Sequence, residues 1–185
     1  MVMQRFTGSD PHRIIGYTQN DTTRFLKLTA KAMGASSTRL QGTVIGEHGD
    51  TAVLLFSSLR LDGTPVDIDE DLKTQIRNNH KNTLKASIAL HSGWTSGWTS
   101  SVGLARMVEA IAQQSDEIIP CSVRLGGEYG IGGISIGVPA RLGLTGVREV
   151  VQLELSQSEA EELRHSAAYL HGIVRETGLD SGPTP

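Results

Sequence analysis

Two spacings of apolar residues alternate along the chain and divide it into helices and strands. Residues 20–34 place apolar side chains at the three- and four-residue spacing of a helix that is buried on one side. Asn20 or Asp21 is suited to cap the start of this helix, and Gly34 is suited to end it. The next segment, residues 40–46, is short and ends in apolar residues, as expected of a strand. The first part of the chain is therefore predicted to form a helix followed by a strand.

The rest of the chain contains further segments of both kinds. Helices are predicted at residues 67–90, 102–114 and 156–178, and strands at residues 13–16, 51–66, 118–125, 133–143 and 149–155, with a turn at Asp62–Gly63 and a loop at residues 91–101. The last helix has Ser156 or Ser158 as its cap, with a glutamate three residues beyond Ser156 and glutamates three and four residues beyond Ser158. Because the strands come in runs and not one by one between helices, the pattern indicates an α+β fold with an antiparallel or mixed sheet.

Length and composition indicate one ordinary globular domain. The chain has 185 residues and a formal net charge of −3, so no nucleic-acid or membrane-surface partner is expected. We expect one domain over residues 1–178 and a disordered tail over residues 179–185. The single cysteine, Cys121, cannot form an internal disulfide, which agrees with a reducing compartment. It lies in an apolar strand and is expected in the core. With no signal peptide and no membrane-spanning run in the sequence, we expect a cytoplasmic protein.

The glycine-rich segment LGGEYGIGGISIG, residues 125–137, raises the possibility of a phosphate-binding loop. A dinucleotide-binding loop lies between a strand and a helix, whereas this segment has predicted strands on both sides. A hairpin turn is therefore the better interpretation of these glycines.

Six histidines are the main candidates for acid–base chemistry, and no group of histidine, cysteine and aspartate has the spacing of a metal site. His80, His165 and His171 lie in polar helical segments, where we expect them to be solvated. The one G-x-S-x-G match, GISIG at residues 133–137, lies within a predicted strand and not at a strand-to-helix turn, so the sequence does not favour a serine hydrolase. His48 differs from the others because it lies in GEHGD, a turn with two glycines directly after a predicted strand.

Asp21 and Arg24, three residues apart, share one face at the start of the first long helix. In one interpretation, Asp21 caps the helix, Arg24 is solvated and His48 is a polar residue at a strand end. In the other, Asp21 accepts a hydrogen bond from His48 and favours its protonated form, while Arg24 binds a substrate carboxylate through two parallel hydrogen bonds. His48 would then exchange a proton with an oxygen beside that carboxylate. The pattern alone leaves both interpretations open.

These residues, taken with the blocks around them, resemble the C-terminal, substrate-binding domain of the lactate/malate dehydrogenase family. The resemblance runs from Phe6 to Thr177. NDTTRF is similar to the family motif LDSARF, and GTVIGEHGDTAV is similar to the family's histidine signature. The blocks ARMVEAI, PCSVRLGGEYGI and GVPARLGLTGVREVVQLELSQSE then follow in the family order. The segments GTVIGEHGD, LDGTPV and ARMVEAI look closer to the malate dehydrogenases of the lactate-dehydrogenase-like branch.

The resemblance implies a role for each matched residue. His48 corresponds to the proton donor and acceptor, Asp21 to its carboxylate partner, and Arg24 to the residue that binds the substrate carboxylate. A hydroxyl residue beside the substrate falls at Ser96 by ungapped counting, with Thr95 next to it. The tetrapeptide GWTS occurs twice in this segment, so the alignment with the family shifts by several residues there. The alignment also shifts between Gly16 and Asp21, where one position of the family pattern is missing.

Family members also carry an N-terminal Rossmann domain that binds NAD, and no such domain is expected in this chain. The resemblance therefore implies a substrate-binding and proton-transfer domain of an NAD-dependent 2-hydroxy-acid dehydrogenase, for malate in preference to lactate, which is inactive without a cofactor domain. We expect no cofactor on this chain alone. Expected partners are a small 2-hydroxy or 2-oxo carboxylate, a separate cofactor domain and further copies of the chain. The alternative is a non-catalytic domain that binds carboxylates or assembles into oligomers.

Overall fold

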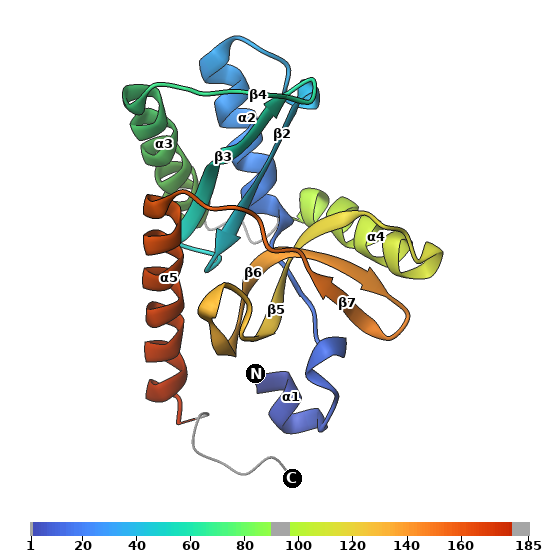
Figure 1. The fold of residues 1–185 in the computed structure, drawn as a ribbon. Helices are drawn as coiled ribbons and strands as arrows, with labels where there is room; N and C mark the ends of the chain where they lie inside the picture. The colour runs from blue at the N-terminus through green and yellow to red at the C-terminus, as the bar shows by residue number, and fades with distance from the viewer. Residues whose placement is uncertain (1, 90–96, 179–185) are drawn as a thin grey trace.

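The computed structural model describes residues 2–89 and 97–178 and has the order of elements shown in Figure 1. The helices are α1 (Val2–Thr7), α2 (Gln19–Met33), α3 (Glu70–Ala89), α4 (Gly97–Gln113) and α5 (Gln157–Glu176), and three short 3-10 turns lie at Pro11–Arg13, Ser37–Arg39 and Glu128–Gly130. The strands are β1 (Gly16–Tyr17), β2 (Leu40–Gly46), β3 (Ala52–Leu61), β4 (Thr64–Pro65), β5 (Ile118–Gly126), β6 (Gly132–Gly143) and β7 (Gly146–Val150).

The strands form one sheet in the order β1-β5-β6-β2-β3-β4, with β7 paired to β6. Each strand pair in the described residues is antiparallel, which confirms the predicted α+β class. The β2–β3 hairpin joins the β5–β6 hairpin at a single pair, Gly46 opposite Gly137. A Cβ atom on Gly137 would lie 2.7 Å from the carbonyl oxygen of Gly46, so the close approach requires a glycine there. This junction brings the end of β2 into the middle of the sheet.

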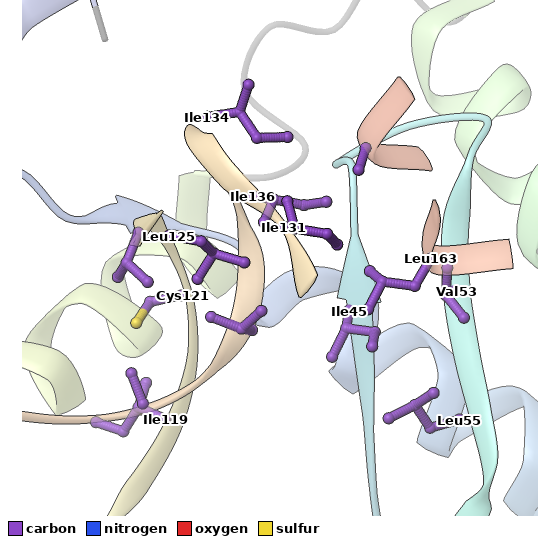
Figure 2. Close-up of a cluster of buried hydrophobic side chains, with 14 of the residues drawn as sticks. Ile45, Val53, Leu55, Ile119, Cys121, Leu125, Ile131, Ile134, Ile136 and Leu163 are labelled. Carbon is purple, nitrogen blue, oxygen red and sulfur yellow. The ribbon is translucent and has the colours of Figure 1, made fainter. Parts of the chain in front are cut away.

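The β2–β3 hairpin is buried on both faces. Ile45, Val53 and Leu55 contribute to the larger core, shared with β5, β6, α4 and α5, and Figure 2 shows these side chains facing the isoleucines of β6. Val44 and Phe56 point the other way, into a second cluster with side chains of α2 and α3. Strands covered on both faces need apolar residues at successive positions, as in the run VLLF. The hairpin is therefore held between α2 and α3 on one face and α5 on the other.

Several predicted boundaries are confirmed. The strand predicted at residues 40–46 is β2 as the structure has it, and Gly34 ends α2 in a left-handed conformation with φ 66°. The last helix is capped by Ser156 in a reciprocal capping box with Glu159. The glycine-rich segment is a hairpin connection between β5 and β6, as the sequence indicated.

The strand predicted at residues 149–155 was wrong at both ends, because β7 spans Gly146–Val150. Pro139 lies on the neighbouring strand at this point and has no N–H to continue the ladder, although its carbonyl still accepts from Val151. The segment beyond is held by a side chain instead. The Tyr129 hydroxyl donates to the carbonyl of Val151 at 3.1 Å and accepts from the N–H of Leu153 at 2.8 Å.

Two further predictions near helix and strand starts were wrong, and one helix was not predicted. The start of the chain forms the short helix α1, which no pattern indicated, and the strand predicted at residues 13–16 is reduced to β1, Gly16–Tyr17. The helix α4 begins at Gly97, so the second GWTS belongs to its first turn and not to a loop. Glycine, serine and threonine are common at helix starts as well as in loops, and composition alone did not separate the two.

The cap of α2 also differs from the prediction. Thr18 is the N-cap residue, with no hydrogen bond from its side chain, and Asn20 and Asp21 lie inside the first turn. The carboxylate of Asp21 is therefore available for contacts outside its own helix.

Candidate functional site

A turn between β2 and β3 carries His48 and is fixed from two sides. Gly46, at its start, has φ 92°, a conformation that favours glycine. The N–H of Glu47 donates to the Ser166 hydroxyl on α5 at 2.8 Å, and the Glu47 carboxylate accepts from both the N–H and the hydroxyl of Thr51, at 3.1 and 3.0 Å. The turn is therefore bonded both to α5 and across its own ends. These bonds fix the position of His48 relative to the sheet.

The helix α2 is held against the same strand by a side-chain bond. The hydroxyl of Thr22 accepts from the N–H of Val44 at 3.0 Å, and both residues are buried. Thr22 follows Asp21 directly. The bond therefore fixes the position of α2 along the direction of β2. This position places Asp21 beside the turn that follows the strand.

Asp21 is the centre of the site. Its side chain is only 5% exposed, and its Oδ2 atom is in hydrogen-bond contact with Nδ1 of His48. Its Oδ1 atom accepts from Nη1 of Arg24 at 2.8 Å. One buried carboxylate thus contacts both an imidazole and a guanidinium. Asp21, His48 and Arg24 are the three residues that the sequence analysis considered together as a possible substrate site.

The contact with Asp21 changes the acid–base behaviour of His48. The hydrogen bond to the carboxylate raises the pKa of His48 above its ordinary value of 6.5, with burial opposing the shift and the negative charge of Asp21 supporting it. With Nδ1 directed at Asp21, the other ring nitrogen, Nε2, is left for a proton exchange. The His48 side chain is 48% exposed, so a small molecule has access to it.

His80 is a fourth member of the site that the sequence analysis missed. It was expected to be solvated, but it is 2% exposed on α3, and its Nε2 atom lies 3.9 Å from Oδ1 of Asp21. Burial lowers the pKa of His80 below 6.5, and Asp21 partly opposes this effect. A signal was present in the sequence, because Leu72, Ile76 and His80 recur every four residues and Ile76 is buried on the same face of the helix.

The helix α4 reaches the site through the second GWTS. The amide of Asn20, next to Asp21, donates to the Ser100 hydroxyl at 3.0 Å and accepts from the Tyr17 hydroxyl at 2.9 Å. Burial, followed by the charge of Asp21, raises the pKa of Tyr17. The predicted hydroxyl residues Ser96 and Thr95 lie outside the residues that the structure describes.

Cys121 is fully buried in the core, as expected, and burial raises the pKa of its thiol to about 12, so it is not an activated nucleophile. Across residues 2–89 and 97–178, no group of three histidine, cysteine or acidic side chains is arranged to hold a metal ion. In the same part of the chain, no helix is both long and apolar enough to cross a membrane.

The glycine-rich segment does not fit a dinucleotide. Its glycines connect two antiparallel strands, β5 and β6, through a 3-10 turn at Glu128–Gly130, and no helix follows them. A phosphate-binding loop needs the N-terminus of a helix to face the phosphates. The segment therefore offers no site for the pyrophosphate of NAD.

Comparison with known proteins shows which family this chain is similar to. Residues 18–178 match the family model for the lactate/malate dehydrogenase, alpha/beta C-terminal domain. An L-lactate dehydrogenase of Bacillus licheniformis is 32% identical over 185 residues, covering 92% of this chain and 56% of that protein. A malate dehydrogenase of Natronomonas pharaonis is 34% identical over 162 residues, covering 87% of this chain and 53% of that protein.

Solved structures give the same result. The malate dehydrogenase of Salinibacter ruber superposes with a TM-score of 0.80 at 31% identity, over 93% of this chain and 59% of that one. The malate dehydrogenase of Aeropyrum pernix gives a TM-score of 0.86 at 26% identity, over 95% of this chain and 59% of that one. The chain thus spans a little over half the length of the relatives it matches.

Proposed function

Because the chain belongs to the lactate/malate dehydrogenase family and corresponds to its alpha/beta C-terminal domain, we propose that it is the substrate-binding and proton-transfer domain of an NAD-dependent 2-hydroxy-acid dehydrogenase. The observation that carries the proposal is the shared carboxylate. Asp21 contacts the imidazole of His48 with one oxygen and the guanidinium of Arg24 with the other. A 2-hydroxy acid presents the two matching groups, a hydroxyl and a carboxylate on adjacent carbons.

In this proposal Arg24 binds the substrate carboxylate. A guanidinium has five N–H donors in a planar fork, so it can keep one N–H on Asp21 or turn fully to a bidentate contact with substrate. The Arg24 side chain is 19% exposed, which leaves part of its fork accessible to a bound anion. Fixing the carboxylate also fixes the neighbouring carbon and its oxygen relative to His48, and such orientation lowers the barrier to reaction.

His48 exchanges the proton. For oxidation of the hydroxyl, neutral His48 accepts the proton at Nε2, and Asp21 stabilises the imidazolium that forms. For reduction of a 2-oxo acid, protonated His48 donates that proton to the oxygen. The raised pKa of His48 keeps more of the protein in the donor form near neutral pH, which favours reduction. In the complete enzyme NAD supplies the hydride chemistry, and we place it on a separate domain because this chain's glycine-rich segment does not fit it.

Among 2-hydroxy acids we favour malate, while lactate is the competing substrate. Relatives of both names match the chain at similar identity, so the choice depends on an assay with both substrates. The purified chain should show no turnover of L-malate or L-lactate with NAD by itself, and turnover should appear when a cofactor domain is supplied. Turnover by the chain alone would contradict the proposal that NAD binds to a separate domain. Absence of turnover with several supplied cofactor domains would contradict it as well. A cytoplasmic location remains an expectation.

The variant Arg24→Lys tests the site directly. Lysine keeps the charge but lacks the planar fork, and a charge-assisted hydrogen bond contributes about 1.5–3 kcal/mol. Affinity for the carboxylate probe oxamate, measured by NMR titration of the chain, should therefore fall by more than about tenfold. Arg39→Lys is the matched control, because Arg39 also pairs with an aspartate, Asp62, but far from His48. Equal affinities in both variants would refute the role of Arg24.

A second candidate function is a non-catalytic domain that binds carboxylates or forms oligomers. The observation favouring it is the apolar surface of α4, where Val102, Leu104 and Val108 are exposed. A homo-oligomer would cover such side chains. Light scattering on the wild type and on Val108→Glu tests the role of this surface, since a dimer held by it should become monomeric in the variant.

A further inference from the structure

The imidazole of His80 lies near Oδ1 of Asp21, whereas His48 contacts Oδ2 of the same carboxylate. Its Nε2 atom is buried and has no hydrogen-bond partner among the described residues. The nearest charged oxygen is Oδ1 of Asp21, at 3.9 Å, just beyond hydrogen-bond distance. A buried ring nitrogen without a partner is uncommon in proteins and calls for an explanation.

Oδ1 of Asp21 is occupied by Arg24 in this structure. In the proposed function, Arg24 binds the substrate carboxylate with its fork. A full bidentate contact would draw Nη1 away from Oδ1, and one oxygen of a buried carboxylate would lose its donor. Such a loss is unfavourable, because a buried charge depends on its hydrogen bonds. It would also let the carboxylate rotate and release His48.

We propose that His80 is a positioning residue that donates its Nε2–H to Oδ1 of Asp21 when Arg24 turns to the substrate carboxylate. The donor replaces Arg24 on the same oxygen, so Asp21 keeps its orientation and its bond to His48 throughout binding. A movement of about 1 Å brings the two atoms to a normal hydrogen-bond distance. The proposal rests on the proposed function, because it requires Arg24 to bind a carboxylate.

The surroundings favour a neutral His80 in this role. Burial lowers its pKa, and the positive charges of Arg24 and His48 act in the same direction, against the charge of Asp21. A neutral imidazole can still donate through Nε2 in one tautomer. Because it adds no positive charge beside Asp21, it holds the carboxylate without weakening the attraction between Asp21 and protonated His48.

The first test follows the ring nitrogens by NMR. The full chain, labelled with ¹⁵N-histidine and ¹⁵N-arginine, is titrated with sodium oxamate. We expect the Arg24 side-chain resonances to move, and the Nε2 and attached proton of His80 to shift downfield with the same saturation curve. A saturating shift of Arg24 with an unchanged His80 would overturn the inference and leave the proposed function standing. No shift of Arg24 would overturn both.

The second test compares two replacements of His80. His80→Gln keeps an N–H donor, whereas His80→Leu has none. We expect oxamate affinity to fall by about tenfold in His80→Leu and to recover to within about threefold of wild type in His80→Gln. The pKa of His48 in the oxamate complex should follow the same order. His165→Leu, an exposed histidine on α5, is the control and should change neither quantity.

A purely structural role gives a different pattern. Both His80 variants would then lose thermal stability, with oxamate affinity and the pKa of His48 unchanged in the folded fraction, and the inference would fail. If His80→Leu does not fold, the comparison of His80→Gln with the wild type and the ring-nitrogen titration decide the matter.

Discussion

Asp21 and Asp62 both pair with an arginine, but they sit in opposite surroundings. Asp21 is 5% exposed and is held between two elements, α2 and the turn after β2. Asp62 is 54% exposed and lies at the tip of the β3–β4 hairpin. Its carboxylate accepts from two nitrogens of Arg39, from Nε, which lies 3.1 Å from Oδ1 and 3.0 Å from Oδ2, and from Nη2. The better arginine geometry thus belongs to the exposed pair. Burial, and the number of groups that depend on one carboxylate, separate the site from an ordinary surface ion pair.

The largest effect is expected from Asp21→Asn. The change keeps the shape of the side chain but removes the charge that both Arg24 and His48 contact, so it should lower the free energy of unfolding by about 1.5–3 kcal/mol. The matched variant is Asp62→Asn, which also suits the left-handed backbone of that position, with φ 49°. Its pair is solvated, and no measurable change is expected.

Urea unfolding of the two variants measures both values. Equal stabilities for Asp21→Asn and Asp62→Asn would mean that burial does not distinguish the two pairs. A gain in stability for Asp21→Asn would instead mean that the desolvation of the carboxylate outweighs its bonds, as happens at some functional sites.

A smaller effect is expected at the anchor of the turn that carries His48. The buried hydroxyl of Ser166 accepts from the N–H of Glu47 and lies 3.1 Å from the hydroxyl of Thr51. Ser166→Ala should cost about 1–2 kcal/mol, because a buried donor loses its partner. The amide hydrogen of Glu47 should also exchange faster. Ser158→Ala, at an exposed serine of the same helix, is the control and should leave both measurements unchanged.

The sequence predicted the parts of the site that depend on local pattern. The strand ending in a glycine turn and the Asp21–Arg24 spacing both came from short-range signals, and the structure brings Asp21, Arg24 and His48 together. Their catalytic roles stay predictions, because they rest on the family resemblance. Ser96 and Thr95 also stay predictions.

What the sequence missed depends on packing between elements. His80 looked solvated because its neighbours Asn79 and Lys81 are polar, although it shares the four-residue spacing of Ile76, and in the fold it lies buried beside Asp21 of α2. The end of β7 depends on Pro139 and Tyr129, which are distant in sequence from the strand that they terminate. One amino-acid sequence does not show which residues distant along the chain come into contact.

The third prediction concerns pH, where the two pairs should respond in opposite directions. The pKa of His48 is raised above 6.5, so its contribution to stability is complete below about pH 6.5 and is lost as pH rises through the folded value. The pKa of Asp62 is lowered below 3.8, mainly by hydrogen bonds from Arg39, so its contribution is present above about pH 3.8 and is lost as pH falls through the folded value.

Residue-specific NMR titration is the right measurement, because buried His80 has a lowered pKa and opposes His48 in any global unfolding curve. Asp21→Asn should lower the pKa of His48, while Asp62→Asn should leave it where it is. A His48 pKa at or below 6.5 in the wild type would contradict the pairing.

The smallest effect is expected from salt, and it separates the two pairs without any mutation. Screening acts over roughly 8 Å at physiological ionic strength and roughly 3 Å at 1 M, and it acts most strongly on exposed charges. In 1 M NaCl the pKa of Asp62 should therefore move back up toward 3.8, since water and ions reach both Arg39 and Asp62. The pKa of His48 should move less, because the carboxylate that raises it is buried. Arg39→Gln supplies the control, because without the cation the pKa of Asp62 should no longer depend on salt in this way. If salt lowers the pKa of His48 as much as it raises that of Asp62, then Asp21 is open to solvent, and it could not hold His48 and Arg24 in the way that the proposed function requires.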